Sequence, residues 1–461
     1  MLLKFSVGNY LSFKDVVEFR MAAGKPTRHD SHIAVLRGGK RVLKGGFIFG
    51  ANASGKSNLV RAFEFAKNIV LIGSNSGDCY KKYFRIDSAY KDKPGIFQFD
   101  IYAGGHFYSY GFAVSYQSAE IDSEWFYRID NNDECIFERA RDESGKMKVI
   151  NKIQFADEKE ASRFAVYSED IDNDAMKRKT FLSDMAARSS LQAECYKPFR
   201  DVISWFNNLI IIYPKTKFAG INAFICDNEK RFSLERHLKY FDTGIEAVSR
   251  TEKSLDKVFG DFPEDFKASL KEDILRGLSE SDIEGKEICS RVGFRGELYD
   301  IILRNDELIF NDIVSSHGNS EDMFDLVDES DGTRRLFDLL PLYHKALSGC
   351  VIIIDELDRS LHTKATVEFI KRFYEEAKDC EAQLIATTHD SNVLDLDILR
   401  QDEIWLVERM NNHASSIKSL NAYSPRHDKD IEKDYLIGRY GAVPVFNHLA
   451  LLDDEDGECI G

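Results

Sequence analysis

Paired cysteines, long apolar runs and an excess of positive charge are all missing from this 461-residue chain. Its eight cysteines are scattered and none forms a C-x-x-C pair, which argues against both a disulfide framework and a zinc site. No apolar run approaches the length that a membrane-spanning helix needs, and the first residues, with Lys4, Lys14 and Asp15, do not resemble a signal peptide. We therefore expect a cytoplasmic protein with no membrane partner.

Proline and glycine are also scarce, with 8 and 29 residues, which excludes a collagen-like chain and a low-complexity chain. Acidic residues outnumber basic ones, so the formal net charge is -16 and the pI is about 5.3. This balance argues against a broad basic face for nucleic acid, although it leaves open a DNA-binding groove built by several subunits. The length gives room for two or three domains with a sizeable core.

Apolar periodicity divides the chain into segments of different secondary structure. Apolar residues alternate around 3–7 and 17–19, which predicts a β-hairpin, and period two returns from about 95 to 150. From about 155 to 290 the period becomes helical without a sustained heptad pattern, and strand patterns resume after that. We expect an α/β fold with a mixed sheet, an antiparallel section and a largely helical insert. The expected domains are 1–154, 155–290 and 291–461.

The segment GANASGKS at residues 50–57 matches the phosphate-loop pattern G-x-x-x-x-G-K-[ST] without a mismatch. Glycine lets backbone N–H groups wrap around phosphate oxygens, and the N-terminus of the following helix adds to the attraction. The preceding run FIF is typical of a strand, and helical periodicity follows the loop. We therefore expect a nucleotide site, with Lys56 at the β- and γ-phosphates and Ser57 on Mg²⁺. The candidate binding residues are Gly50, Asn52, Ser54, Gly55, Lys56, Ser57 and Asn58.

The segment VIIIDELDRSLH at residues 351–362 ends an apolar run with two carboxylates, Asp355 and Glu356. A run of buried β-branched residues is typical of a central parallel strand, whose carboxyl end faces the ligand. We expect Asp355 to lie beside Ser57 and hold Mg²⁺, and Glu356 to polarise the attacking water as a general base. Without the phosphate loop, the same residues would fit an ordinary strand that ends in two surface carboxylates.

The segment QLIATTHDSNVLD places a third strand before Thr388, His389 and Asp390. A lone histidine is more often structural than catalytic. Because this histidine closes a strand some thirty residues after the Asp-Glu pair, we expect His389 to sense the γ-phosphate and to steady the attacking water.

These three elements, in this order, resemble the ATP-binding-cassette (ABC) class of ATPases. The resemblance supplies an interpretation of ESDGTRRL at residues 329–336. In that class a signature containing Ser and Gly, at a helix N-terminus, reaches across a dimer interface to the γ-phosphate on the partner's phosphate loop. It implies that Ser330, Gly332 and Thr333 bind a nucleotide held by a second copy, so that ATP is shared between chains. Without the family, the segment is only a helix N-cap.

Longer stretches resemble a bacterial family of stand-alone ABC-type ATPases found in anti-phage and abortive-infection operons. These stretches are FSVGNYLSFKD, DELDRSLH, TTHDSNVLDLDILRQDEIWLVER and DIEKDYLIGRYGAVPVF. The likeness is dense over the first seventy residues and over about 325–447, and weak over 155–290. Within this family the length and layout are most similar to the AriA-type ATPase subunits of PARIS defence systems.

The resemblance implies an ABC-ATPase-like head that uses ATP and Mg²⁺ and works as an oligomer, either an ATP-sandwich dimer or a larger ring. It further implies three partners: a second copy of the chain, a separately encoded effector nuclease of the TOPRIM type, and a phage-encoded trigger. On this reading the ATPase is a sensor and scaffold that holds the nuclease and releases it when the trigger appears.

Two other functions share these head motifs. A DNA-repair ATPase related to Rad50, SMC and RecF proteins predicts basic residues along the insert and, in the Rad50 and SMC branches, long heptad stretches, and neither is evident in the sequence. A transporter ATPase would need a membrane partner and usually has a compact insert. The glutamine loop of the ABC class cannot be placed, Gln98 being the candidate, and Arg439 in the tail suggests only an interface or a buried structural position.

Overall fold

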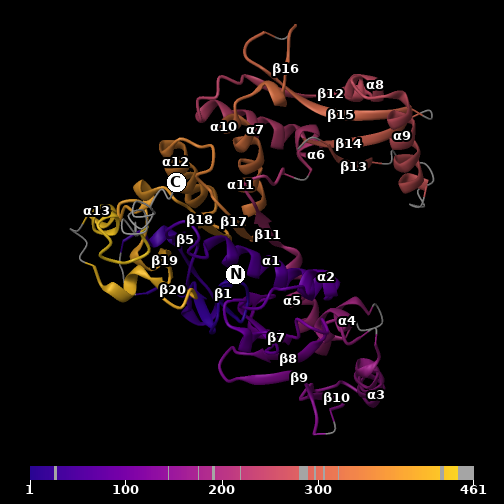
Figure 1. Cartoon of the computed structure of the whole chain (residues 1–461), viewed down its shortest axis with the longest axis vertical. Coiled ribbons are helices and arrows are strands. Elements are labelled where there is room, and N and C mark those ends of the chain that lie inside the picture. The colour runs from indigo at the N-terminus through magenta and orange to yellow at the C-terminus, as the bar shows by residue number, and fades with distance from the viewer. Residues whose placement is uncertain are drawn as a thin grey trace, which may run out of the picture. The chain divides into compact units, whose positions relative to one another are not determined.

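The computed structural model describes residues 1–444 with short omissions. The omitted positions are 25–27, 144, 175, 189–192, 219, 280–288, 295–296, 305–306, 320 and 426–429. The chain divides into two compact units. The first comprises Met1–Ile212, Ala346–Asp358 and Thr366–Gly461, and the second comprises Tyr213–Lys345 and Arg359–Ala365. Figure 1 shows the labelled elements of both units.

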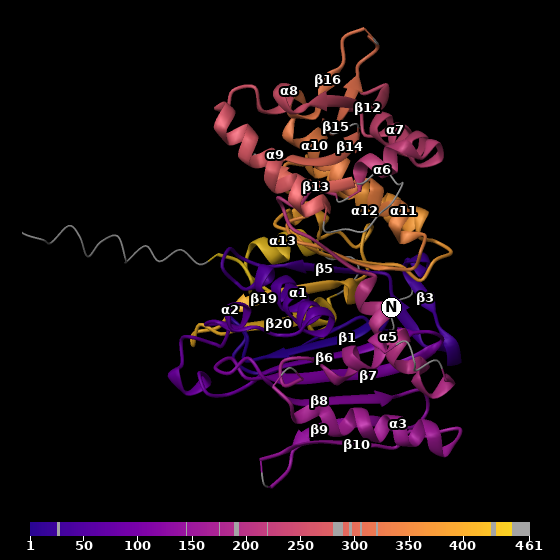
Figure 2. The ribbon, with the colours of Figure 1, turned by 90° about the vertical axis from the view of Figure 1, so that its right-hand side faces the viewer.

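The first unit contains an antiparallel sheet of seven strands in the order β10-β9-β8-β7-β6-β1-β2, of which Figure 2 shows β6 to β10 one after another. Its strands are β1 (Leu2–Gly8), β2 (Val17–Arg20), β6 (Gly95–Ala103), β7 (His106–Val114), β8 (Ile121–Arg128), β9 (Glu134–Arg141) and β10 (Met147–Asn151). Burial alternates along β6, as expected for a pleated strand with one covered face. The predicted hairpin and the predicted antiparallel section are both confirmed.

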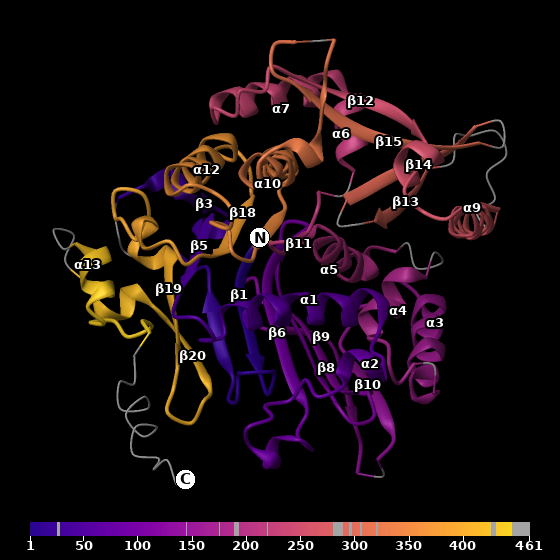
Figure 3. The ribbon, with the colours of Figure 1, turned by 45° about the horizontal axis from the view of Figure 1, so that its top comes forward.

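A second sheet of the first unit has the order β11-β17-β18-β5-β19-β20. Figure 3 labels β11, β18, β5, β19 and β20 of this sheet. Its strands are β5 (Gly45–Phe49), β11 (Leu209–Ile212), β17 (Val351–Ile354), β18 (Gln383–Thr387), β19 (Ile404–Arg409) and β20 (Ser415–Ser419). Strands β11, β17, β18, β5 and β19 are parallel, whereas β20 pairs antiparallel with β19. Every residue of β5, β17 and β18 is buried, which is typical of parallel strands covered on both faces. Their carboxyl ends meet at one edge, where ligands bind in open parallel sheets.

Helix α1 contacts both of these sheets. Its Phe63 stacks on Phe5 of β1 with 3.9 Å between ring centroids, and its Lys67 ammonium donates to the carbonyl of Leu209 in β11 at 2.6 Å. The first unit also contains a two-stranded sheet of β3 (Ile33–Val35) and β4 (Arg41–Leu43). The helices that lie mainly in this unit are α1 (Lys56–Ile72), α2 (Ser76–Cys79), α3 (Glu158–Glu169), α4 (Phe181–Ala187), α5 (Lys197–Asn207), α12 (Thr363–Glu376) and α13 (Ile431–Leu436). In the described part of the chain, no helix is both long enough and apolar enough to cross a membrane.

The boundaries of the two units differ from those of the three domains expected from the sequence. Helices α3 to α5, which were expected in the insert 155–290, belong to the first unit. A buried carboxylate attaches α4 to the antiparallel sheet. Glu124 of β8 accepts hydrogen bonds from the backbone N–H groups of Phe181 (2.7 Å) and Leu182 (3.0 Å). Buried Arg139 of β9 lies 3.6 Å from the same carboxylate and compensates its charge.

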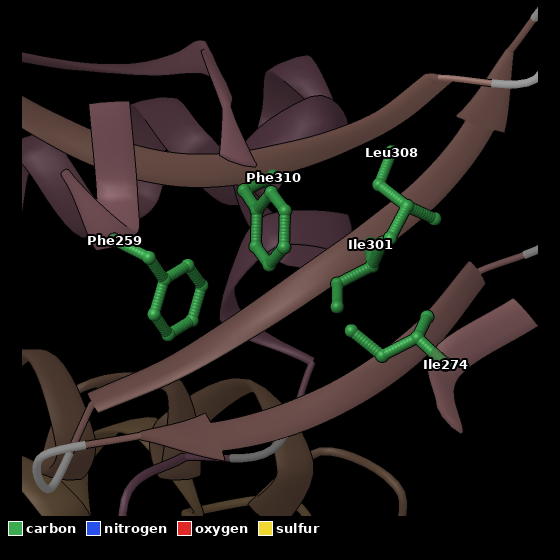
Figure 4. Packing of buried hydrophobic residues seen from close by; sticks show 5 residues of the cluster. All are labelled: Phe259, Ile274, Ile301, Leu308 and Phe310. Atoms are coloured by element: carbon green, nitrogen blue, oxygen red, sulfur yellow. The ribbon is translucent and has the colours of Figure 1, made fainter. Parts of the chain in front are cut away.

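The second unit is built on a five-stranded sheet in the order β12-β15-β14-β13, with β16 paired to β15. Its strands are β12 (Ala247–Ser254), β13 (Cys289–Phe294), β14 (Glu297–Arg304), β15 (Glu307–Ser316) and β16 (Phe324–Asp325). Its helices are α6 (Ile221–Cys226), α7 (Asn228–Tyr240), α8 (Leu255–Phe259), α9 (Glu264–Ser279), α10 (Asp331–Leu339) and α11 (Pro341–Ala346). Figure 4 shows part of its core, where Phe259 and Ile274 of α8 and α9 face Ile301, Leu308 and Phe310 of β14 and β15.

Parts of the expected helical region are strands, among them β11 and β12. The segment SLERHLKYFDTGIEAVSR was predicted to be helical, but α7 ends at Tyr240 and residues 247–254 form β12. Gly244, with φ of 77°, lies in the turn between them, a conformation that glycine adopts without strain. Strand β12 pairs along its whole length with β15, a partner that is distant in the sequence. This non-local pairing overrides the local periodicity.

Candidate nucleotide site

The phosphate loop follows directly after β5, and its two glycines are required by close contacts. A Cβ atom on Gly50 would lie 2.3 Å from the carbonyl oxygen of Val407, so only glycine fits there. Gly55 has φ of 115°, and a Cβ there would lie 2.2 Å from the hydroxyl of Ser415. Helix α1 starts at the next residue, Lys56, so its free N–H groups point toward the loop. The order strand, loop, helix is the one predicted from the sequence.

Lys56 lies over the loop with its side chain buried. Its ammonium donates hydrogen bonds to the carbonyls of Gly50 at 2.6 Å and Ala51 at 3.0 Å. Burial lowers the pKa of Lys56 to about 8, although the carboxylates of Asp355, Asp358 and Glu356 raise it in part. A buried ammonium of this kind is stabilised by any further negative charge, such as a phosphate oxygen.

Strand β17 brings the Asp-Glu pair to the same place. The hydroxyl of Ser57 donates to Asp355 Oδ1 at 3.1 Å, and Thr387 at the end of β18 donates to the same oxygen at 2.6 Å. Thr387 Oγ1 in turn accepts the backbone N–H of Glu356 at 2.8 Å. Glu356 has φ of 50°, a left-handed conformation that is uncommon outside glycine and is frequent at functional sites.

His389 follows β18 and faces the lysine. Its Nδ1 lies 3.5 Å from Lys56 Nζ, and its backbone N–H donates to the carboxylate of Asp358 at 3.2 and 3.3 Å. Burial, and then the positive charge of Lys56, lower the pKa of His389. The imidazole is therefore neutral near pH 7 and can accept a proton or a hydrogen bond.

These groups surround one cavity of about 510 Å³. Its lining contains the candidate residues Asn52, Ser54, Gly55, Lys56, Ser57, Asn58, Glu356 and His389, together with Ala53 and Arg61. A second cavity, of about 370 Å³, shares Ala53 and Asn58 with it and is also lined by Tyr83, Arg85 and Arg409. An aromatic ring and guanidinium groups beside a phosphate loop suit the planar base of a nucleotide.

Several supporting residues were missed from the sequence. Ser415 at the start of β20 donates to the carbonyl of Ser54 at 2.5 Å, and Asn58 donates to the hydroxyl of Ser12 at 2.9 Å. Ser12 lies within the N-terminal stretch that resembles the family, but no chemical pattern singled it out. Thr387 and Asp358 were also missed. Thr387 donates to Asp355, and Asp358 accepts the backbone N–H of His389. These hydrogen bonds join segments that meet only in the folded chain, so no sequence pattern marks the two residues.

The signature candidates lie in the second unit. Ser330 is the N-cap of α10, where its hydroxyl accepts the backbone N–H of Thr333 at 3.1 Å. A Cβ on Gly332 would lie 2.8 Å from the carbonyl oxygen of Ser360, so close packing also disfavours any larger residue at this position. Gln98 lies on β6, where its amide donates to Asp100 and Ser109, so nothing in its contacts supports a glutamine-loop role.

The residues present fit both ATP and Mg²⁺. A hydroxyl and a carboxylate, Ser57 and Asp355, form the hard oxygen pair that Mg²⁺ prefers. The glycine-lined loop and the buried Lys56 fit a polyphosphate. Glu356 and the neutral His389 both line the cavity, and each can accept a proton from water or orient it.

Solved structures of SMC heads are similar at low identity. They are an SMC head bound to the C-winged helix domain of ScpA, an SMC head domain from Thermotoga maritima, and an SMC head with an extended coiled coil bound to the C-terminal domain of ScpA derived from Pyrococcus furiosus. Their identities are 12%, 12% and 16%, and their TM-scores are 0.41, 0.35 and 0.33. The matches cover 92%, 91% and 92% of this chain and 99%, 98% and 97% of those chains. At these TM-scores the likeness carries no conclusion about this protein.

No curated protein matches the chain in sequence. A family model does match residues 47–395, which is more than half of the chain, and its description is "AAA domain, putative AbiEii toxin, Type IV TA system". The matched range contains the phosphate loop, the Asp-Glu pair and His389. The chain therefore belongs to this family of AAA domains.

Proposed function

We propose that this protein is the ATP-hydrolysing sensor and scaffold subunit of an anti-phage defence system. In this role it acts in the cytoplasm and holds a separately encoded nuclease of the TOPRIM type. It releases that nuclease when a phage-encoded trigger appears. This is the role that the resemblance to the AriA-type subunits of PARIS systems implies.

The proposal depends on one observation above all. Lys56, Ser57, Asp355, Glu356 and His389 come from three separate parts of the chain and meet at one edge of a parallel sheet. Membership of an AAA-domain family implies the use of ATP, typically with Mg²⁺. The abortive-infection context in the family description supports a defence role rather than a housekeeping one.

Each residue has a proposed task in hydrolysis. Lys56 and the N–H groups of the loop bind the β- and γ-phosphates, while Ser57 and Asp355 hold Mg²⁺, which neutralises phosphate charge when bound. Glu356 accepts a proton from the attacking water, and neutral His389 orients that water beside the γ-phosphate. Asn52, Ser54 and Asn58 complete the binding loop, and the cavity with Tyr83 takes the base.

We further propose that Ser330, Gly332 and Thr333 of one copy complete the site of a second copy. The N-terminus of α10 offers a hydroxyl and free N–H groups, which suit a terminal phosphate. Hydrolysis then requires an isologous pair of chains, either as a dimer or within a larger ring.

Ser330→Arg is expected to stop turnover without weakening nucleotide binding by the single chain. The long cation would block close approach of α10 to another chain, so we expect the hydrolysis rate per chain to fall about tenfold or more, with the Kd within about twofold. Ser330→Thr is the matched control, because it keeps the hydroxyl and the N-cap. A purified monomer that hydrolyses ATP at a rate proportional to protein concentration would contradict the shared site.

The experiment that tests the whole proposal is a gentle pull-down of the protein from its native host, with mass spectrometry and a nuclease-treated control. A co-purifying nuclease in fixed stoichiometry, without nucleic acid, is the expected result. Co-purifying DNA without a partner protein would overturn the proposal. It would favour the alternative, a DNA-repair ATPase related to RecF, SMC and Rad50 proteins.

A further inference from the structure

The tail stretch YLIGRYGAVP belongs to a compact C-terminal element, which we define as residues 430–444: helix α13 and the turns that follow it. Tyrosine hydroxyls hold this element together. Tyr435 donates to the carbonyl of Ala442 at 3.1 Å, and Tyr440 donates to Asp434 at 3.2 Å. Arg439 pairs with Asp434 at 3.1 Å, and its side chain is 55% exposed, so the buried position considered for it is wrong.

The C-terminal element contacts the segment that carries His389. Ser391, two residues after His389, donates its hydroxyl to Glu432 Oε1 of α13 at 2.8 Å. The backbone of this segment also turns locally, because Asp390 Oδ1 accepts the N–H of Asn392 at 3.1 Å. Glu432 therefore restrains the segment from outside, next to the histidine that faces Lys56.

The same element also lies across a cavity from the phosphate loop. A cavity of about 580 Å³ separates the two, lined on one side by Ala51, Asn52 and Ser54 and on the other by Ala442, Val443 and Pro444. Glu408, near the end of β19, also lines this cavity. A Cβ on Gly441 would lie 2.9 Å from the Glu408 carboxylate, and Gly441 has φ of 68°. Glycine at 441 is thus required both by its conformation and by this contact.

The phosphate loop is the wall between two cavities. Asn52 and Ser54 line the nucleotide cavity and also the cavity behind the loop. The Ser54 side chain is 2% exposed, and its hydroxyl has no hydrogen-bond partner among the described residues. A buried hydroxyl without a partner costs free energy, so a loop movement that satisfies it would be favoured.

We propose that the C-terminal element positions the nucleotide site from two sides and responds to its occupancy. Glu432 accepts a hydrogen bond from Ser391 and so restrains the segment of His389. On the other side, the residues from Ala442 to Pro444 face the phosphate loop across the cavity. Phosphate binding on the front of the loop moves the loop relative to the cavity behind it. Contact of the γ-phosphate with His389 moves the segment that Glu432 holds through Ser391. Because the hydrogen bond at Glu432 and the cavity wall near Pro444 belong to one compact element, occupancy shifts the population of its conformations. This inference rests on the proposed nucleotide function.

Hydrogen exchange with mass spectrometry on the full chain tests the response, with Mg²⁺ and AMP-PNP, a non-hydrolysable ATP analogue, as the probe. We expect slower exchange in peptides from residues 50–60 and also from 430–444, with neither change in Lys56→Ala. Protection of the loop peptides alone would overturn the inference while leaving the nucleotide function intact. Protection of neither region in the wild-type protein would instead refute the nucleotide function on which the inference rests.

Variants of Glu432 test the positioning role. Glu432→Ala removes the acceptor for Ser391, so we expect kcat for ATP hydrolysis to fall by about three- to tenfold while the nucleotide Kd stays within about twofold. Glu432→Gln is expected to restore kcat, because its amide oxygen still accepts the hydroxyl. Lys433→Ala, an exposed change on the same helix, is the matched control. Wild-type kcat in Glu432→Ala, or an equal loss in both Glu432 variants, would overturn the positioning role.

Discussion

Lys56→Ala is expected to weaken ATP binding by about two to three orders of magnitude and to remove hydrolysis, since each charge-assisted hydrogen bond contributes about 1.5–3 kcal/mol. The ammonium is buried against the carbonyls of Gly50 and Ala51, and the loop segment 50–57 contains no other charged residue that could replace it. Titration with a fluorescent nucleotide measures the Kd, and a thermal melt confirms that the variant is folded. Lys371→Ala, which removes an exposed lysine from α12, should behave as wild type.

The pH dependence of binding provides an internal check on this role. The pKa of Lys56 is lowered to about 8 by burial, and the protonated amine is the form that attracts phosphate. The Kd should therefore be nearly flat below pH 8 and rise by up to about tenfold per pH unit above it, as linkage requires. The rise should disappear in Lys56→Arg, whose guanidinium stays charged. Affinity that improves above pH 8 would contradict the assignment.

Glu356→Gln is expected to leave ATP bound and unhydrolysed. The amide has the shape of the carboxylate but cannot accept a proton, and general-base catalysis contributes about 10²–10⁴-fold. The backbone N–H of Glu356 donates to Thr387 Oγ1 at 2.8 Å, a hydrogen bond that the substitution keeps, so we expect the local conformation and the Kd to stay nearly unchanged. Single-turnover hydrolysis and filter-bound nucleotide measure the two quantities separately.

The matched control for this variant is Glu375→Gln, which makes the same chemical change on α12, where the side chain of Glu375 is 66% exposed. It should hydrolyse ATP at the wild-type rate. Wild-type hydrolysis in Glu356→Gln would show that another group activates the water. Loss of nucleotide binding would instead assign Glu356 a structural role.

Local chemistry explains which parts of the site could be predicted. The phosphate loop is a short continuous segment whose glycines, lysine and serine act through their own backbone and their own side chains, so its spacing is enough to recognise it. Strands β17 and β18 are short, mainly apolar runs, which indicated buried strands and placed Asp355 and His389 at or just after their ends. The domain boundaries were less predictable, because Glu124 attaches α4 to a strand more than fifty residues earlier in the chain.

The sequence by itself determined the α/β class, the phosphate loop and the two strand ends, since each follows from residues that are neighbours in the chain. Tertiary structure alone decided that Thr387 joins Asp355 to Glu356 and that Ser12 and Ser415 support the loop. It also decided that β12 is a strand and that the tail lies behind the phosphate loop. The reason is physical: these roles arise from contacts between segments that are separated in the chain, by 32 residues for Thr387 and Asp355 and by 361 for Ser415 and Ser54, and such contacts leave no periodic trace in either segment.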